Sequence, residues 1–217
     1  MNKKMIFPMV GIFLTTLLVA CKNDKTPSNE SKTDTTTKLG TTYSLDVTNS
    51  KIEWKGYKVF KSENTSHFGT INFKNGELTV KDNQLESGNF VADVTSLQNE
   101  DIKDDAQQKA KLEGHLKSGD FFEVEKFPTA SFSITKVEKN PTNTDYNSVL
   151  EGNLTIKGVT KSVKFNANVS VENDEVTIAT EPTDIKREDF GVKFQIPIAN
   201  GLIKNEVNIQ ILVKAKK

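Results

Sequence analysis

Hydrophobic and polar residues alternate with a period of two over most of the chain beyond residue 42. The clearest case is residues 207–215, where Val207, Ile209 and Ile211 alternate with Asn208 and Gln210. This alternation is typical of a strand with one buried face. Similar patterns predict further strands at 52–59, 70–73, 78–80, 89–94, 130–134, 150–156, 163–171, 176–180 and 192–196. The sequence therefore predicts an all-β domain of about eight to ten strands.

Short turn sequences separate several of these segments. Asn75-Gly76 lies between two of them and is the strongest short hairpin signal. Lys157-Gly158 and residues 172–175 separate others. Strands joined by short turns pair as antiparallel neighbours, and closing the meander into a barrel removes its exposed edges. We expect an antiparallel barrel, with a β-sandwich as the main alternative.

Residues 101–117 do not follow the strand pattern. They place Ala110, Leu112 and Leu116 among good helix formers, and Asp104 and Asp105 suit the N-terminal turn of a helix. We expect a short helix here that packs against or over one end of the barrel.

The first 20 residues are typical of a secretory signal peptide. Lys3 and Lys4 precede an apolar run over residues 6–19, which is short for a membrane span of about 20 residues. A single anchoring helix is the alternative. Cys21 follows Leu18-Val19-Ala20, and this pattern resembles the lipobox of bacterial lipoproteins. The resemblance implies that the Cys21 thiol carries a diacylglyceryl group, although Cys21 could instead simply end an ordinary signal peptide.

Residues 21–42 are almost wholly polar, which predicts a flexible tether ahead of a folded domain at residues 43–217. Because Cys21 is the only cysteine, the fold has no disulfide. We expect a membrane-anchored lipoprotein of the cell envelope that faces the periplasm or the cell surface. The sequence leaves the choice of membrane open.

The composition argues against two classes of function, nucleic-acid binding and catalysis. With 29 basic and 29 acidic residues the chain has no basic excess of the kind that nucleic-acid binding needs. Two histidines and one cysteine are too few for a catalytic metal centre, and neither histidine lies near a nucleophile elbow. We therefore expect no enzyme activity, no cofactor, no metal and no nucleic-acid partner.

Four blocks of sequence resemble the YceI-like family. They are residues 65–69 followed by Phe73, residues 112–128, residues 152–161 and residues 187–191. The blocks occur in the family's order and span nearly all of residues 43–217. The resemblance implies a lipocalin-like barrel of eight antiparallel strands around an elongated apolar pocket. It also implies that the ligand is a polyisoprenoid or a similar long-chain lipid.

Candidate ligand-binding residues follow from the pattern and the resemblance together. The pocket candidates are Trp54, Phe68, Phe73, Phe90, Phe132, Phe165 and Phe194. Taken singly, each of these aromatic residues is more often ordinary core than part of a pocket. The candidates for a polar head group are His67, His115 and Arg187, since a guanidinium can bind phosphate through two hydrogen bonds. Arg187 could instead form a structural ion pair with Asp184, Glu188 or Asp189, and either histidine could be a hydrogen-bonded structural residue.

The leading hypothesis from the sequence is a lipid-anchored protein that binds a long-chain lipid for transport, storage or protection. The first alternative is a structural or interaction module of the envelope whose barrel is filled by its own side chains. The second is an enzyme that acts on a lipid inside the pocket.

Overall fold

The structure is a computed structural model that describes residues 40–197 and 199–217. The predicted signal peptide, Cys21 and nearly all of the predicted tether lie outside the described residues, so these expectations stay predictions.

Ten strands, one α-helix and one 3-10 helix form within the described ranges. In chain order they are β1 (Thr41–Leu45), β2 (Lys51–Phe60), β3 (Glu63–Lys81), β4 (Gln84–Asn99), α1 (Ala106–Lys117), β5 (Thr129–Lys139), β6 (Ser148–Ile156), β7 (Val159–Glu172), β8 (Glu175–Thr180), β9 (Thr183–Lys186), η1 (Arg187–Phe190) and β10 (Gly201–Lys216).

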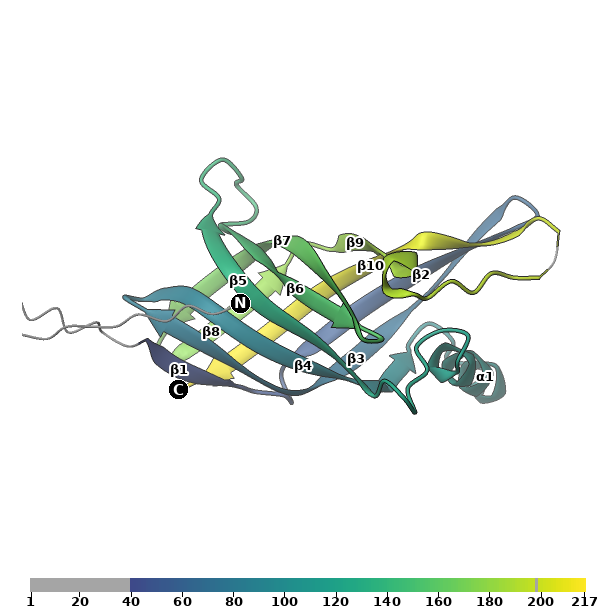
Figure 1. Ribbon diagram of the computed structural model, residues 1–217, viewed down its shortest axis with the longest axis horizontal. Helices are drawn as coiled ribbons and strands as arrows, with labels where there is room; N and C mark the ends of the chain where they lie inside the picture. The colour runs from purple at the N-terminus through teal and green to yellow at the C-terminus, as the bar shows by residue number, and fades with distance from the viewer. Residues whose placement is uncertain (1–39, 198) are drawn as a thin grey trace, which may run out of the picture. The chain divides into compact units, whose positions relative to one another are not determined.

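Eight of the strands close into a barrel. Its order is β2-β3-β4-β5-β6-β7-β8-β10, and β10 pairs again with β2 (Figure 1). Every strand pair is antiparallel. The two short strands extend this ring: β1 pairs with both β3 and β10, and β9 pairs with β10 beyond the end of β8. The prediction of an eight-stranded antiparallel barrel is confirmed.

A hydrophobic core fills the end of the barrel where β10 finishes. Ala215 of β10 pairs with Val176 of β8 and with Leu45 of β1, and Leu78 of β3 pairs with Tyr43 of β1. All but the partly buried Leu45 belong to one buried cluster. Short strand β1 therefore completes the barrel wall between β3 and β10 at this end, and the sequence pattern did not predict it.

The prediction of a hairpin turn at Asn75-Gly76 is wrong. Strand β3 runs through this pair, and its register with β4 shifts between Phe73 and Asn75, which is a β-bulge. A Cβ atom on Gly76 would lie 2.9 Å from the Phe90 ring and 3.0 Å from the Asn89 carbonyl oxygen. Glycine is therefore needed for the close approach of β4, and the turn forms later, where Asp82 and Asn83 have φ values of 48° and 59°.

The predicted strand at residues 192–196 is also absent, so Phe194 lies in the loop between η1 and β10. The side chain of Gln195 explains why. Its Oε1 accepts from the N–H of Ile203 at 2.9 Å, and its Nε2 donates to the Ile203 carbonyl oxygen at 3.1 Å. A side-chain amide thus takes the backbone groups of β10 that a neighbouring strand would use.

The predicted helix is present as α1. The side chain of Asp105 caps it by accepting from the N–H of Gln108 at 2.9 Å. Glu113, one turn before the end, accepts from the backbone N–H of Asn99 at 2.8 Å and so attaches α1 to the end of β4. Over the described ranges of the chain, no helix has both the length and the apolar character that crossing a membrane requires.

Candidate functional site: a cavity in the barrel

The other end of the barrel holds a cavity of about 470 Å³. This volume is within the range of about 300–1,000 Å³ that is typical of small-molecule sites. Its walls come from the barrel strands β2 to β7 and β10, from β9, from α1 and the segment after it, and from η1 with the loop that follows. The lining residues are Ile52, Trp54, Gly56, Tyr57, Lys58, His67, Ile71, Phe73, Phe90, Ala92, Val94, Leu97, Leu112, His115, Leu116, Phe121, Phe122, Ala130, Ser131, Phe132, Leu154, Ile156, Phe165, Ile185, Arg187, Phe190, Val192, Phe194, Ile196, Ile203, Lys204, Val207, Ile209 and Ile211.

Four phenylalanines form the inner end of this cavity. Phe73 and Phe90 pack with ring centroids 5.9 Å apart, and Phe132 and Phe165 pack edge to face at 5.6 Å. All four rings also belong to the buried core cluster. The cavity therefore begins where the packed core ends.

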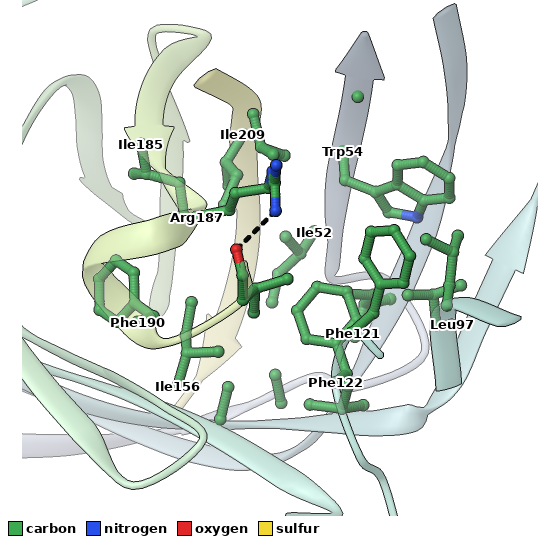
Figure 2. Close-up of a pocket in the computed structure, with 18 of the residues that line it drawn as sticks. Ile52, Trp54, Leu97, Phe121, Phe122, Ile156, Ile185, Arg187, Phe190 and Ile209 are labelled. Atoms are coloured by element: carbon green, nitrogen blue, oxygen red, sulfur yellow. Dashed lines mark hydrogen bonds between the residues drawn. The ribbon is translucent and has the colours of Figure 1, made fainter. Parts of the chain in front are cut away.

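Aliphatic and aromatic side chains form the middle of the cavity. Figure 2 shows Ile52 and Trp54 of β2, Ile209 of β10, and Phe121 and Phe122 of the segment after α1 lining the cavity. The buried Nε1 of Trp54 has no hydrogen-bond partner within the described residues. This part of the wall is apolar enough to receive a hydrocarbon chain.

The side chains on the inward face of β2 change in character along the strand. Ile52, Trp54, Gly56 and Lys58 occupy alternate positions, which place their side chains on the same face of the strand. Ile52 packs against the core cluster, and Lys58 lies six residues further on, about 20 Å along the strand. The inward face of β2 thus runs from apolar at the core to basic at the far end.

An aromatic cluster lies where α1 meets the loop after η1. The ring centroid of His115 is 5.0 Å from that of Phe121 and 4.8 Å from that of Phe194. The Phe121 and Phe194 centroids are 5.3 Å apart. The cluster packs α1 and the segment after it against the loop after η1.

Arg187 uses its guanidinium to hold the chain together. Nε donates to the carbonyl oxygen of Lys204 at 3.0 Å, Nη1 to that of Val192 at 2.6 Å and Nη2 to that of Ile203 at 3.1 Å. Figure 2 shows the second of these hydrogen bonds as a dashed line. Burial lowers the pKa of Arg187, and the nearby carboxylate of Glu188, 3.6 Å from Nη2, raises it in part. Its backbone bonds leave Arg187 with little capacity for a ligand.

His67 belongs to a polar network at the ends of β3 and β4. Its Nδ1 lies 2.9 Å from Oδ2 of Asp101. The other carboxylate oxygen of Asp101, Oδ1, accepts from the backbone N–H of Phe68 at 2.9 Å and from the side-chain amide of Asn99. Burial raises the pKa of Asp101, but the hydrogen bonds from Phe68, His67 and Asn99 together outweigh burial and lower that pKa. The network orients the His67 ring beside the cavity.

The structure brings most of the sequence candidates together. Trp54, Phe73, Phe90, Phe132, Phe165, Phe194, His67, His115 and Arg187 all line the cavity. Phe68 does not, because β3 pairs it with Lys55, which points outward, and its side chain is 45% exposed. His115 is held by Asp120, with Nε2 and Oδ2 2.9 Å apart.

Sequence reasoning missed two basic residues of the lining, Lys58 and Lys204. The alternation along residues 52–58 could have placed Lys58 inward. Lys204 follows Ile203, where a register shift interrupts the pairing of β10 with β2, so no period could have placed it.

The lining contains no aspartate or glutamate. Across residues 40–197 and 199–217, no three histidine, cysteine or acidic residues are grouped as a metal ion would require. The geometry therefore offers an apolar chamber with basic groups.

Comparison with known proteins identifies the domain. Residues 43–215 match the YceI-like domain. A UPF0312 protein of Pseudomonas aeruginosa is 34% identical over 110 residues, which cover 48% of this chain and 53% of the relative. Protein YceI of Salmonella arizonae is 29% identical over 145 residues, which cover 63% of this chain and 70% of the relative. The chain thus spans about half the length of the first of these relatives.

Two solved structures share the fold. BcnA of Burkholderia cenocepacia superposes with a TM-score of 0.60 at 19% identity and covers 79% of this chain and 99% of BcnA. A polyisoprenoid binding domain from Saccharophagus degradans, implicated in plant cell wall breakdown, gives 0.52 at 16% identity, covering 82% and 99%. Identities this low show the fold alone. Because the family match extends over residues 43–215, the chain belongs to the YceI-like family.

Proposed function

We propose that the barrel binds one long-chain apolar ligand, a polyisoprenoid or a similar amphiphile, inside its cavity. The observation that carries the proposal is a chamber of about 470 Å³ whose inner end and middle are apolar. Each methylene that leaves water there contributes about 0.8 kcal/mol. A chain that runs from the phenylalanines to the level of Lys58 gains this contribution along its length.

Two further observations support this proposal. The family match is to a YceI-like domain, and one protein of the same fold is described as a polyisoprenoid binding domain. A barrel packed solid by its own side chains, which a purely structural module would have, does not agree with the cavity.

Native lipid analysis tests the proposal. The full chain is purified from its host and extracted with organic solvent, which removes non-covalent lipid and leaves any acyl group on Cys21. We expect about one long-chain lipid per chain by mass spectrometry, and the delipidated protein should bind a matching lipid again. Protein that carries no lipid and takes none up would refute the proposal.

We also propose that the protein is anchored in the cell envelope through a lipid on Cys21, with residues 21–42 as a tether. The lipobox-like residues before Cys21 support this proposal. Replacement Cys21→Ser should abolish metabolic labelling with radioactive palmitate and release the protein from membranes. Labelling that persists in the variant would contradict it.

A further inference from the structure

Five basic residues line the cavity, and four of them already interact with other groups of the protein. Arg187 donates to three carbonyl oxygens, His67 contacts Asp101, and His115 contacts Asp120. The ammonium of Lys204 lies 5.6 Å from the centroid of the Tyr57 ring. The fifth is Lys58.

Among the described residues, Lys58 lacks the ion pair that several other strand lysines form with a glutamate. Lys51, Lys136, Lys164 and Lys214 each lie within about 3 Å of a glutamate oxygen, at 2.6, 2.8, 3.1 and 3.0 Å. Within the part of the chain that the structure describes, the ammonium of Lys58 has no carboxylate oxygen within 4.0 Å. Lys58 is also half-buried at an inward position of β2.

The surroundings of Lys58 favour an anion. His67 of β3 is opposite Gly56, two residues from Lys58 on the same face, so both basic side chains border the same space. Asp101 compensates His67, but the lining supplies no acidic side chain to compensate Lys58. A half-buried ammonium gains more from an anionic oxygen than an exposed one does, because the local dielectric is lower.

We propose that Lys58 binds an anionic head group and thereby makes the cavity selective for acidic amphiphiles. This inference rests on the proposed function, since it requires a chain in the cavity. The head group lies at the level of Lys58, and its chain extends past Trp54 toward Phe73 and Phe90. Phosphate and carboxylate share the oxygens that an ammonium recognises.

The test compares two ligands that share one chain and differ only in the head. Delipidated full-length protein is titrated with farnesyl phosphate and with farnesol. We expect the phosphate to bind at least about tenfold more tightly, since a hydrogen bond to a charged group is worth this much or more. Replacement Lys58→Gln should remove this preference, measured as the ratio of the two affinities, and Lys58→Arg should retain it.

Lys55→Gln is the matched control, because Lys55 lies on the same strand, is exposed and does not line the cavity. It should keep the full preference for the phosphate. Equal affinity of the wild type for both ligands, or a preference that survives Lys58→Gln, would overturn the assignment of Lys58. Failure of both ligands to bind would instead count against the proposed function.

Discussion

At the scale of single residues, Arg187 connects the loop after η1 to strand β10. Its side chain is only 6% exposed and bonds to the carbonyl oxygens of Val192, Ile203 and Lys204. Replacement Arg187→Met removes all three of these hydrogen bonds, so we expect the free energy of unfolding to fall by about 2–4 kcal/mol. Urea denaturation followed by the fluorescence of Trp54, the only tryptophan, measures the change.

The exposed neighbour Lys186 provides the control for Arg187. Lys186→Met should change the free energy of unfolding by no more than about 0.5 kcal/mol. If both replacements had the same small effect, the structural role assigned to the guanidinium would be wrong.

Position 69 requires glycine because β3 and β4 approach each other closely there. A Cβ atom at this position would collide with the backbone of Gln98, which cannot move without breaking the strand pairing. We expect Gly69→Ala to lower the free energy of unfolding by at least about 2 kcal/mol.

Gly114 of α1 provides the contrasting case. A Cβ atom there would meet nothing within 4 Å beyond the backbone of its own helix, so Gly114→Ala should raise the free energy of unfolding by about 0.5–1 kcal/mol. Equal effects of the two replacements in urea denaturation would contradict this view.

Asp101 links stability to pH. Its pKa is lowered in the folded protein from the ordinary value of 3.8, because its hydrogen bonds outweigh the effect of burial. Its contribution is therefore fully present above the unfolded pKa and is lost as the pH falls through the lower folded value. We expect the wild type to be more stable than Asp101→Asn at neutral pH and the two stability curves to converge below about pH 4. Parallel curves from pH 7 to pH 3 in urea denaturation would exclude this linkage.

At the scale of elements, α1 depends on a few polar contacts because none of its side chains is fully buried. Glu113 holds it to β4 through the N–H of Asn99, and Lys109 is 3.9 Å from the same carboxylate. We expect Glu113→Ala to speed hydrogen exchange in residues 106–117, since the attachment to β4 is lost. The exposed Glu125 serves as control, and Glu125→Ala should leave that exchange unchanged. Similar exchange in both variants would show that other contacts hold the helix.

Strands with a simple period could be predicted from the sequence, and irregular segments could not. The alternation in residues 163–171 and 207–215 located most of β7 and of β10, and polar pairs located the turns after β6 and β7. Asn75-Gly76 misled the prediction because a glycine required for close packing has the same sequence signature as a glycine in a turn. Residues 192–196 misled it because an alternating pattern does not reveal that Gln195 occupies the edge of β10.

The candidate site could likewise be predicted only where its residues lie on regular strands. Inward aromatics on regular strands, such as Phe132 and Phe165, could be placed beside the axis of the barrel from the period alone. The period does not tell whether such rings fill the space or surround it, since an eight-stranded barrel can do either. That distinction depends on the packing of all strands at once.

At the scale of the whole molecule, the barrel is divided into a packed end and a hollow end, and this division makes a direct prediction. Ala130 of β5 lines the cavity two residues from Phe132, where a larger side chain would occupy the space of a ligand. We expect Ala130→Phe to weaken binding of farnesol by at least about tenfold, while the free energy of unfolding falls by no more than about 1–3 kcal/mol. Ser133→Phe is the control, because its odd position on the same strand points away from the inward face of Ala130, Phe132 and Ile134. If Ala130→Phe bound farnesol as well as Ser133→Phe does, the ligand would not lie in the hollow end of the barrel, because the added phenyl ring and the ligand cannot occupy the same space.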